Sequence, residues 1–358
     1  MKFLNSVVHG DCIDKLAQIP DKSIDLIFAD PPYNLQLNNR LNRSNRTRVD
    51  AVSDKWDKFD NFSEYDKFTY SWLKECKRVL KKDGTIWVIG SYHNIFRVGK
   101  IIQDLDFWIL NDVLWIKSNP MPNFMGTRFN NAHETMIWAS ENENSKYTFN
   151  YKSMKVFNDD KQLRSDWYIP VCGGEERIKD KYGKRVHSTQ KPYELLYRII
   201  MSSSKVGNTV LDPFFGTGTT GAVAKYLGRN FIGIEKEKKY IKIALKRIAK
   251  ITPLDKKYLT LKIEDKKVKV PFGNLIESNY IKIGENLYSK NEDIIVIILA
   301  NATIKFKEEI GSIHTISAKI LKRESANGWN YWYVKRDNKL ISIDELRQRY
   351  IEKNYQKE

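Results

Sequence analysis

The chain has 358 residues, enough for a large catalytic domain and a small second one, and it carries a formal net charge of +17. That charge, with 9 Trp and 19 Tyr, favours a polyanionic partner whose bases can stack, although a basic but unspecific surface is the alternative. Its 3 cysteines are widely spaced and no stretch approaches the ~20 apolar residues of a membrane span, so we expect no disulfide framework, no metal and no membrane partner.

The first predicted elements lead to a carboxylate at the end of a strand. The chain is expected to begin with a short strand, a turn at Asp11, a short helix and a second, apolar strand. That strand ends at Asp30, and Pro31 and Pro32 then forbid both a helix and a β-ladder, so that only carbonyl acceptors precede the ring of Tyr33. Such a turn suits an amine donor on a flat ring. The alternative is that Asp30 caps a turn and the prolines only end the strand.

Methylation of an exocyclic amine, such as that of adenine, is the chemistry that needs this set of acceptors. The lone pair of that nitrogen is delocalised into the ring, and hydrogen bonds accepted from both N–H groups localise it and stabilise the transition state. An amine inside a duplex cannot reach a pocket, so the nucleotide has to be flipped out of the stack, with Tyr33 stacked on it.

A long irregular stretch, residues 34–60, follows the proline turn. A loop of this length inside a compact domain is usually functional or disordered. We interpret it as an arm that contacts DNA phosphates rather than as a surface loop without a binding role, because it carries Arg40, Arg43, Arg46 and Arg48. A helix with an apolar stripe is predicted next over residues 63–80, and a β-branched strand over residues 85–90.

Residues 118–169 interrupt the alternation of strands and helices with prolines, polar residues and scattered aromatic residues. Arginine suits guanine and asparagine suits adenine in the major groove of DNA. Several side chains here are therefore candidates for reading base edges, namely Arg128, Asn130, Asn131 and His133. The alternative for each of them is a polar loop residue that satisfies its own turn.

A glycine-bearing loop between two strands marks the second half of the predicted sheet. A strand ending at Asp212 enters a loop with Gly216 and Gly218, a helix starts near Thr219, and the next strand ends at Glu235. Glycines let a backbone approach a ligand closely, and an acid at the tip of the following strand is placed to bind ribose hydroxyls. The alternative for each feature, taken alone, is a glycine in an ordinary loop or a solvent-exposed glutamate. Alternating strands and helices imply a parallel sheet, so both halves should open on one crevice.

After residue 255 the composition becomes lysine-rich and β-branched, and we place a domain boundary there. Residues 256–358 are predicted to form a small basic, aromatic domain that binds DNA. Within it we expect Asn327, Trp329 and Trp332 to contact bases or backbone. A hairpin that packs its own aromatic core is the alternative.

Together, the segment from Asp30 to Tyr33, residues 212–218 and Glu235 resemble the catalytic, methionine-binding and ribose-binding motifs of S-adenosylmethionine-dependent DNA adenine-N6 methyltransferases. The order of these motifs is similar to that of the β group, and the resemblance covers essentially the whole chain. It implies an α/β fold, a doubly wound Rossmann-like methyltransferase sheet with the catalytic half before the cofactor half, and a small C-terminal α+β domain.

The resemblance also implies roles for individual residues. The catalytic residues would be Asp30, Pro31, Pro32 and Tyr33. The cofactor would be S-adenosylmethionine, held by Asp11, Asp30, Lys191, Asp212, Pro213, Phe214, Gly216, Gly218, Thr219 and Glu235.

Residues 122–134 and 325–333 resemble segments of the cell-cycle-regulated (CcrM) and HinfI-like enzymes, which methylate adenine in 5′-GANTC-3′. The implied partner is double-stranded DNA and the implied location is the bacterial cytoplasm, at the nucleoid; whether the active unit is a homodimer stays open. A cytosine-N4 enzyme usually has serine at the place of Asp30, and a glutamine-modifying protein methyltransferase usually has asparagine there. A non-catalytic DNA-binding protein would not need an intact cofactor half.

Overall fold

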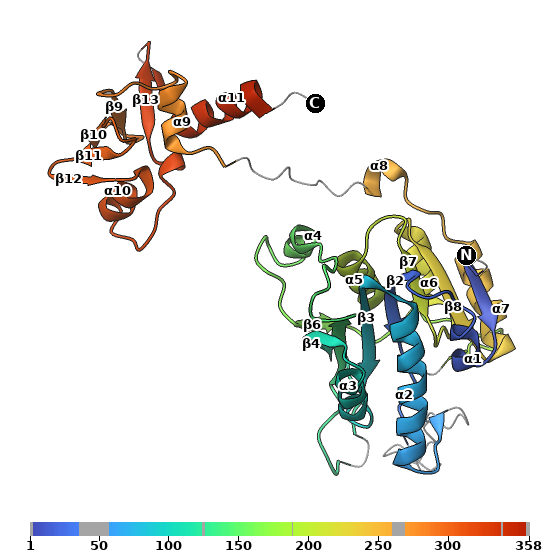
Figure 1. The fold of residues 1–358 in the computed structure, drawn as a ribbon. Coiled ribbons are helices and arrows are strands. Elements are labelled where there is room, and N and C mark those ends of the chain that lie inside the picture. The colour runs from blue at the N-terminus through green and yellow to red at the C-terminus, as the bar shows by residue number, and fades with distance from the viewer. Residues whose placement is uncertain are drawn as a thin grey trace. The chain divides into compact units, whose positions relative to one another are not determined.

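The computed structural model describes residues 3–35, 57–123, 126–187, 189–259, 269–337 and 339–355 of the chain. The chain divides into two units, Met1–Leu261 and Lys262–Glu358, and each has its own sheet and its own hydrophobic core (Figure 1). The boundary that the sequence predicts after residue 255 falls at the start of helix α8 (Lys256–Leu259), a few residues before this division.

An eight-stranded sheet organises the first unit, and the predicted doubly wound α/β architecture is confirmed. Among the described strands only β5 runs antiparallel to its neighbours, and all other pairs are parallel. In spatial order the strands are β1 (Ser6–His9), β8 (Asn230–Glu235), β7 (Thr209–Asp212), β2 (Ile24–Ala29), β3 (Leu80–Gly90), β5 (His133–Ser140), β4 (Trp108–Lys117) and β6 (Asp166–Ile169). Because β2 and β7 are parallel neighbours, the turns that follow them meet at one edge of the sheet.

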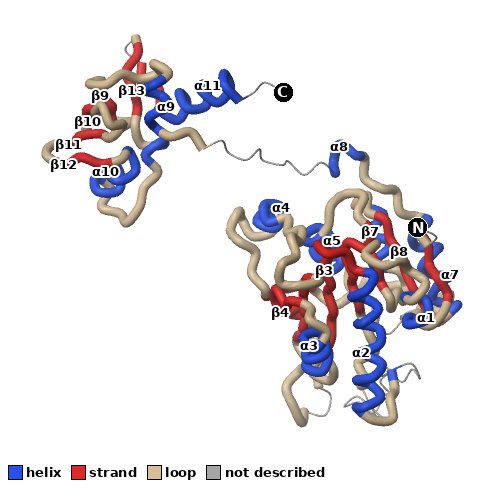
Figure 2. The backbone as a smooth tube through the Cα atoms, in the orientation of Figure 1, coloured by secondary structure: helices blue, strands red, loops and turns tan. Residues whose placement is uncertain are grey.

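Helices cover both faces of this sheet (Figure 2). One apolar cluster joins the sheet to α1 (Cys12–Leu16), α2 (Phe62–Val79) and α3 (Ile95–Asp104). A second cluster on the other face contains α5 (Tyr193–Ser203), α6 (Thr219–Tyr226) and α7 (Lys238–Ala249), and the short α4 (Tyr151–Val156) packs against α5. Both faces of the sheet are thus buried under helices, as a doubly wound fold requires.

Helix α2 shows how the local sequence sets an element. Its buried residues recur at helical spacing, as predicted, and include Tyr65, Trp72 and Leu73. The side chain of Asn61 caps the helix by accepting a hydrogen bond from the backbone N–H of Glu64 at 2.9 Å. The helix therefore starts at Phe62, and strand β3 already begins at Leu80, before the predicted position.

The C-terminal unit is built on an antiparallel six-stranded sheet with helices, which agrees with the predicted α+β class. Its strands, in spatial order, are β12 (Glu309–Gly311), β11 (Ile304–Phe306), β10 (Ile295–Ile298), β9 (Asn286–Tyr288), β13 (Tyr333–Arg336) and β14 (Lys339–Ser342). Its helices are α9 (Phe272–Glu277), α10 (Ile313–Ile320), the 3-10 turn η2 (Gly328–Asn330) and α11 (Ile343–Tyr355). None of the helices among the described residues has the length and apolarity needed to span a membrane.

The two tryptophans that were expected to contact DNA lie in the core of this unit. Trp332 is fully buried and its indole N–H donates to the carbonyl of Ile313 at 3.2 Å, and Trp329 is only 6% exposed. Asn327 caps η2 by accepting from the backbone N–H of Trp329 at 3.2 Å. A Cβ at Gly328 would lie 2.4 Å from the carbonyl oxygen of Ile313, so only glycine lets the turn approach α10 this closely. Rings buried in this way cannot stack on bases, so for these two tryptophans the structure supports the alternative, a segment that packs its own aromatic core.

Candidate active site

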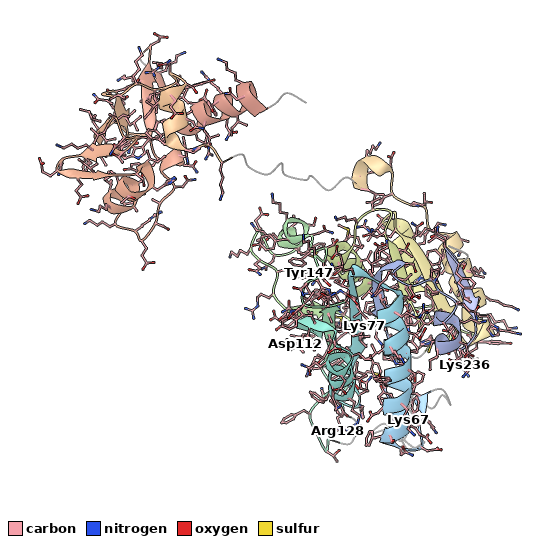
Figure 3. All side chains as sticks on the ribbon, viewed as in Figure 1. Lys67, Lys77, Asp112, Arg128, Tyr147 and Lys236 are labelled. Atoms are coloured by element: carbon pink, nitrogen blue, oxygen red, sulfur yellow. The ribbon has the colours of Figure 1, made fainter. Side chains whose placement is uncertain are left out.

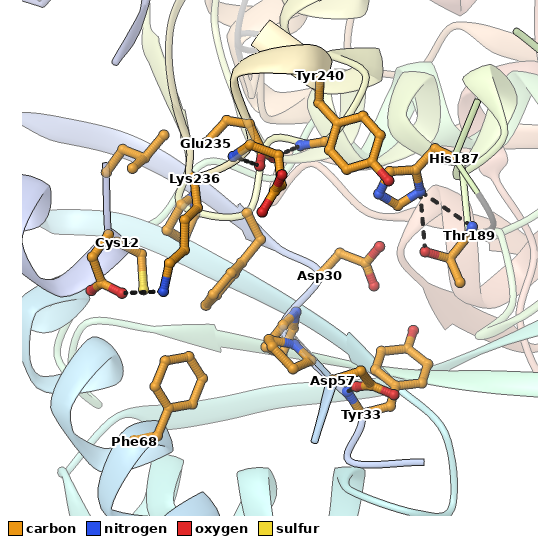
Figure 4. Close-up of a pocket in the computed structure, with 18 of the residues that line it drawn as sticks. Cys12, Asp30, Tyr33, Asp57, Phe68, His187, Thr189, Glu235, Lys236 and Tyr240 are labelled. Atoms are coloured by element: carbon orange, nitrogen blue, oxygen red, sulfur yellow. Dashed lines mark hydrogen bonds and ion pairs between the residues drawn. The ribbon is translucent and has the colours of Figure 1, made fainter. Parts of the chain in front are cut away.

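A cavity of about 380 Å³ opens at the carboxyl edge of β2, β7 and β8 (Figure 4). Parallel strands bring their following turns together there, which is why residues far apart in the sequence share one pocket. Its lining includes predicted residues from both halves of the sheet, namely Asp11, Asp30, Pro31, Pro32, Tyr33, Lys191, Pro213, Phe214, Gly216 and Glu235.

The turn after β2 is held by an acid that lies outside the motif. Asp57 accepts hydrogen bonds from the backbone N–H groups of Tyr33 at 2.5 Å, Asn34 at 2.9 Å and Leu35 at 3.2 Å. The hydroxyl of Tyr65 donates to the carbonyl of Pro32 at 2.8 Å. The Pro32 carbonyl therefore has a partner within the protein.

Asp30 is paired with a buried lysine. The ammonium nitrogen of Lys191 lies 2.8 Å from each carboxylate oxygen of Asp30. Burial raises the pKa of Asp30, and the Lys191 ammonium offsets part of that rise. Burial also acts on Lys191, in the lowering direction, but Asp30 and Glu134 outweigh it and its pKa lies above the usual value. The lysine predicted to bind the cofactor thus lies directly against the carboxylate predicted to be catalytic.

Glu235 and Gly216 shape the other lobe of the cavity. The Glu235 carboxylate accepts from the backbone N–H of Gly216 at 2.7 Å and from that of Glu237 at 2.7 Å. Gly216 has a φ of 51°, a left-handed conformation that glycine adopts without strain. Asp11 accepts from the N–H of Ile13 at 3.0 Å and caps α1. Two carboxylates beside a close-approaching backbone and the wall of Pro213 and Phe214 fit a nucleoside with ribose hydroxyls.

Three predicted cofactor residues do not line this cavity. The carboxylate of Asp212 accepts from the backbone N–H of Phe214 at 2.9 Å and from the hydroxyl of Thr220 at 2.6 Å. A Cβ at Gly218 would lie 2.8 Å from that of Ala244 on α7. The Thr219 hydroxyl accepts from Arg247 at 2.7 Å. The contacts of Asp212 and Thr219, and the lack of room for a Cβ at Gly218, support a role in shaping the loop behind the cavity.

We expect Asp212→Asn to change how the stability of the protein depends on pH. Burial raises the pKa of Asp212 to about 7, from 3.8. Because the pKa of Asp212 is higher in the folded than in the unfolded chain, its contribution to the free energy of unfolding is complete below pH 3.8 and is lost as the pH rises toward 7. The loss has an upper bound of roughly 4 kcal/mol. Asparagine does not titrate and can still accept from Phe214 and donate to Thr220. The melting temperature of the variant, measured relative to that of wild type, should be higher at pH 8 than at pH 5. The same difference between the two proteins at both pH values would contradict this prediction.

The cavity is also lined by residues that the sequence did not single out, among them His187 and Tyr240. The backbone N–H of Thr189 donates to Nδ1 of His187 at 3.2 Å, and the ring centroids of His187 and Tyr240 lie 4.6 Å apart. Burial, assisted by Lys191, lowers the pKa of His187 to about 4, so the ring is neutral near pH 7. A single histidine before a helix carries no pattern that distinguishes it from a surface residue, and only the fold brings it to the cavity.

Four of the residues predicted to contact DNA lie between β4 and the start of β5. Arg128, in the loop between β4 and β5, is exposed and its guanidinium lies 5.8 Å from the ring centroid of Tyr92 (Figure 3). The side chain of Asn130 accepts from the N–H of Asn123 at 2.9 Å and so supports its own loop, whereas Asn131 and His133 are exposed. The four arginines of the predicted arm, Arg40, Arg43, Arg46 and Arg48, lie outside the described residues.

Two family descriptions match the chain. Residues 24–246 match a family described as DNA methylase, and residues 255–356 match one described as Restriction Enzyme Adenine Methylase Associated. Type II methyltransferase M.HinfI of Haemophilus influenzae is 56% identical over 348 residues, which is 97% of this chain and 97% of the relative. Type II methyltransferase M2.MboI of Moraxella bovis is 41% identical over 258 residues, 72% of this chain and 92% of the relative.

Solved structures share the architecture of the first unit. The M1.HpyAVI–SAM complex is 27% identical with a TM-score of 0.50, covering 68% of this chain and 98% of that chain. The PvuII DNA methyltransferase, a cytosine-N4-specific enzyme, is 21% identical with a TM-score of 0.53, covering 71% of this chain and 89% of that chain. The second likeness concerns the fold alone.

Proposed function

The chain belongs to the DNA methylase family and methylates DNA with S-adenosylmethionine, and from that premise we propose that its target is N6 of a flipped adenine in 5′-GANTC-3′. One observation carries the proposal: Asp30 and Tyr33 line the same cavity as Gly216 and Glu235. A base bound at Asp30 thus lies next to the lobe that suits a nucleoside.

S-adenosylmethionine supplies an electrophilic methyl group on a sulfonium. In this cavity Glu235 would hold its ribose hydroxyls and Asp11 its adenine, while the backbone at Gly216 approaches the remainder. The fit rests on the arrangement of these carboxylates around a left-handed glycine.

Asp30 and the carbonyl of Pro31 would accept the two N–H groups of the adenine amine, while Tyr33 stacks on the ring. These acceptors would draw the nitrogen toward tetrahedral geometry and localise its lone pair, which makes it a nucleophile for a methyl group whose bond to sulfur breaks in the transfer. The amine sheds its extra proton only after methylation, when it is cationic. Asp30 therefore acts as a hydrogen-bond acceptor during transfer and need not remove a proton beforehand.

The C-terminal unit is proposed to bind the DNA backbone through its exposed cations. Buried Trp329 and Trp332 support the fold of this unit, so contacts to phosphates are favoured over stacking on bases. A homodimer and a location at the nucleoid in the cytoplasm remain part of this proposal.

The target sequence is tested by transfer of labelled methyl groups to duplexes that carry GANTC or a single substitution within it. A wrong base pair at the G, T or C position should lower kcat/KM by about 5- to 150-fold, equivalent to about 1–3 kcal/mol, whereas a change at N should have little effect. Arg128→Ala should relax discrimination at the guanine alone, which leaves the other positions as internal controls. Sequencing of the product places the methyl group, and equal rates on GANTC and shuffled duplexes would refute the assignment.

A further inference from the structure

A second carboxylate, Glu134 at the start of β5, lies in the same charge cluster as Asp30. The Tyr33 hydroxyl donates to its Oε2 at 2.9 Å, and the Lys191 ammonium lies 3.7 Å from the same oxygen. Lys117 on β4 binds the other oxygen at 2.8 Å. Glu134 therefore contacts Tyr33, which would face the base. It also contacts Lys191, which binds Asp30.

The charged side chains of this cluster are buried, so each of them needs a partner. The side chain of Glu134 is only 12% exposed, and Lys191 above it is 7% exposed. A buried carboxylate is costly unless it is paired and hydrogen-bonded, and here two carboxylates face two ammonium groups. Burial acts to raise the pKa of Glu134, but Lys191 and Lys117 outweigh it and hold that pKa below the usual value. Glu134 is thus an anion beside the catalytic turn.

We propose that Glu134 is a positioning residue for methyl transfer, fixing the ring of Tyr33 and sharing the Lys191 ammonium with Asp30. This inference rests on the proposed function, which places the target base between Asp30 and Tyr33. Its geometry is a ladder of alternating charge: Asp30, Lys191, Glu134 and then Lys117.

The first arm of the proposal concerns Asp30. Lys191 binds both of its oxygens, so the ammonium competes with the amine of the base for the carboxylate lone pairs. Because Glu134 lies next to the same ammonium, Lys191 can move away from Asp30 and still have an anionic partner. Asp30 then keeps its strength as an acceptor when the amine arrives.

The second arm concerns Tyr33. Its backbone is fixed by Asp57 and its hydroxyl by Glu134, so the ring is held at both ends. A ring held in this way presents one face to the base without losing side-chain freedom on binding. Removal of either anchor should lower the rate of transfer more than the affinity for either ligand.

Glu134→Gln tests the first arm fully and the second in part, because the amide removes the charge that shares Lys191 and leaves the Tyr33 hydroxyl only a neutral, weaker acceptor. We expect kcat to fall by about tenfold to a hundredfold, with KM for S-adenosylmethionine and for DNA changed by less than about threefold. Glu141→Gln is the matched control. Glu141 follows the same strand, is buried and is paired with Lys22 at 2.9 Å, so its carboxylate belongs to a different ion pair from the one at Lys191. Its substitution should affect melting temperature and leave kcat unchanged.

Tyr33→Phe and the double variant complete the test, since Phe keeps the ring and loses only the hydroxyl. Tyr33→Phe should lower kcat by about tenfold, and the double variant should lose less than the product of the two single losses. Turnover of Glu134→Gln equal to that of Glu141→Gln, or additive losses in the double variant, would overturn the inference. Asp30→Ala distinguishes failure of the positioning role from failure of the proposed function. If Asp30→Ala is inactive while Glu134→Gln has normal turnover, only the positioning role of Glu134 fails. If Asp30→Ala turns over normally, the proposed function itself fails.

Discussion

Replacement of Asp30 by alanine is expected to lower kcat by at least about a hundredfold to a thousandfold. Its carboxylate lies in the cavity at the end of β2, and without it the amine of the base would keep a delocalised lone pair. Lys191 keeps an anionic neighbour in the variant, because Glu134 lies 3.7 Å from its ammonium. We therefore expect the fold and the cofactor lobe at Gly216 and Glu235 to survive the change.

Single-turnover assays with labelled S-adenosylmethionine measure the loss, and calorimetric titration of the same cofactor measures binding. Asp30→Asn is the matched control, since it keeps the size of the side chain and one acceptor oxygen. Its activity should lie between those of wild type and Asp30→Ala. Turnover of Asp30→Ala within about tenfold of wild type would remove Asp30 from the proposed mechanism.

A chain that ends at Leu261 should fold and bind cofactor but bind DNA on the order of a hundredfold more weakly near physiological salt, with a shallower dependence of affinity on salt. The two apolar clusters of the first unit contain no residue of the C-terminal unit, and the cluster of the C-terminal unit contains none of the first. Each unit thus has its own core, and the truncation removes basic surface without opening the other core.

Fluorescence anisotropy of a labelled duplex at several salt concentrations measures both the affinity and its slope. Melting temperature and cofactor titration of the truncated chain serve as controls for folding. If affinity and slope match those of the full chain, the C-terminal unit makes no contact with phosphates, and the proposal for it fails.

The sequence predicted those parts of the site that lie in continuous segments. Asp30 and Glu235 each end an apolar strand, and Gly216 lies in a loop between a strand and a helix, so local pattern is enough to find them. Asp57 and Glu134 are single acids within polar surroundings. Their roles depend on hydrogen bonds to residues 24 and 101 positions away, which no local pattern encodes.

Two predictions failed or shifted for a related reason. An aromatic segment in a basic domain suits a stacking surface and a packed core equally well, and burial of Trp329 and Trp332 decides for the core. Asp212 was found by its motif, but its carboxylate turns inward to Thr220 and the backbone of Phe214. Sequence identifies the loop, whereas the direction of a side chain depends on what packs behind it.

The clamp at Asp57 also bears on how such enzymes can diverge. Its three hydrogen bonds are all accepted from backbone N–H groups, those of Tyr33, Asn34 and Leu35. They therefore do not depend on which side chains these three positions carry. Related enzymes could exchange the side chain that follows the two prolines while the turn keeps its backbone shape.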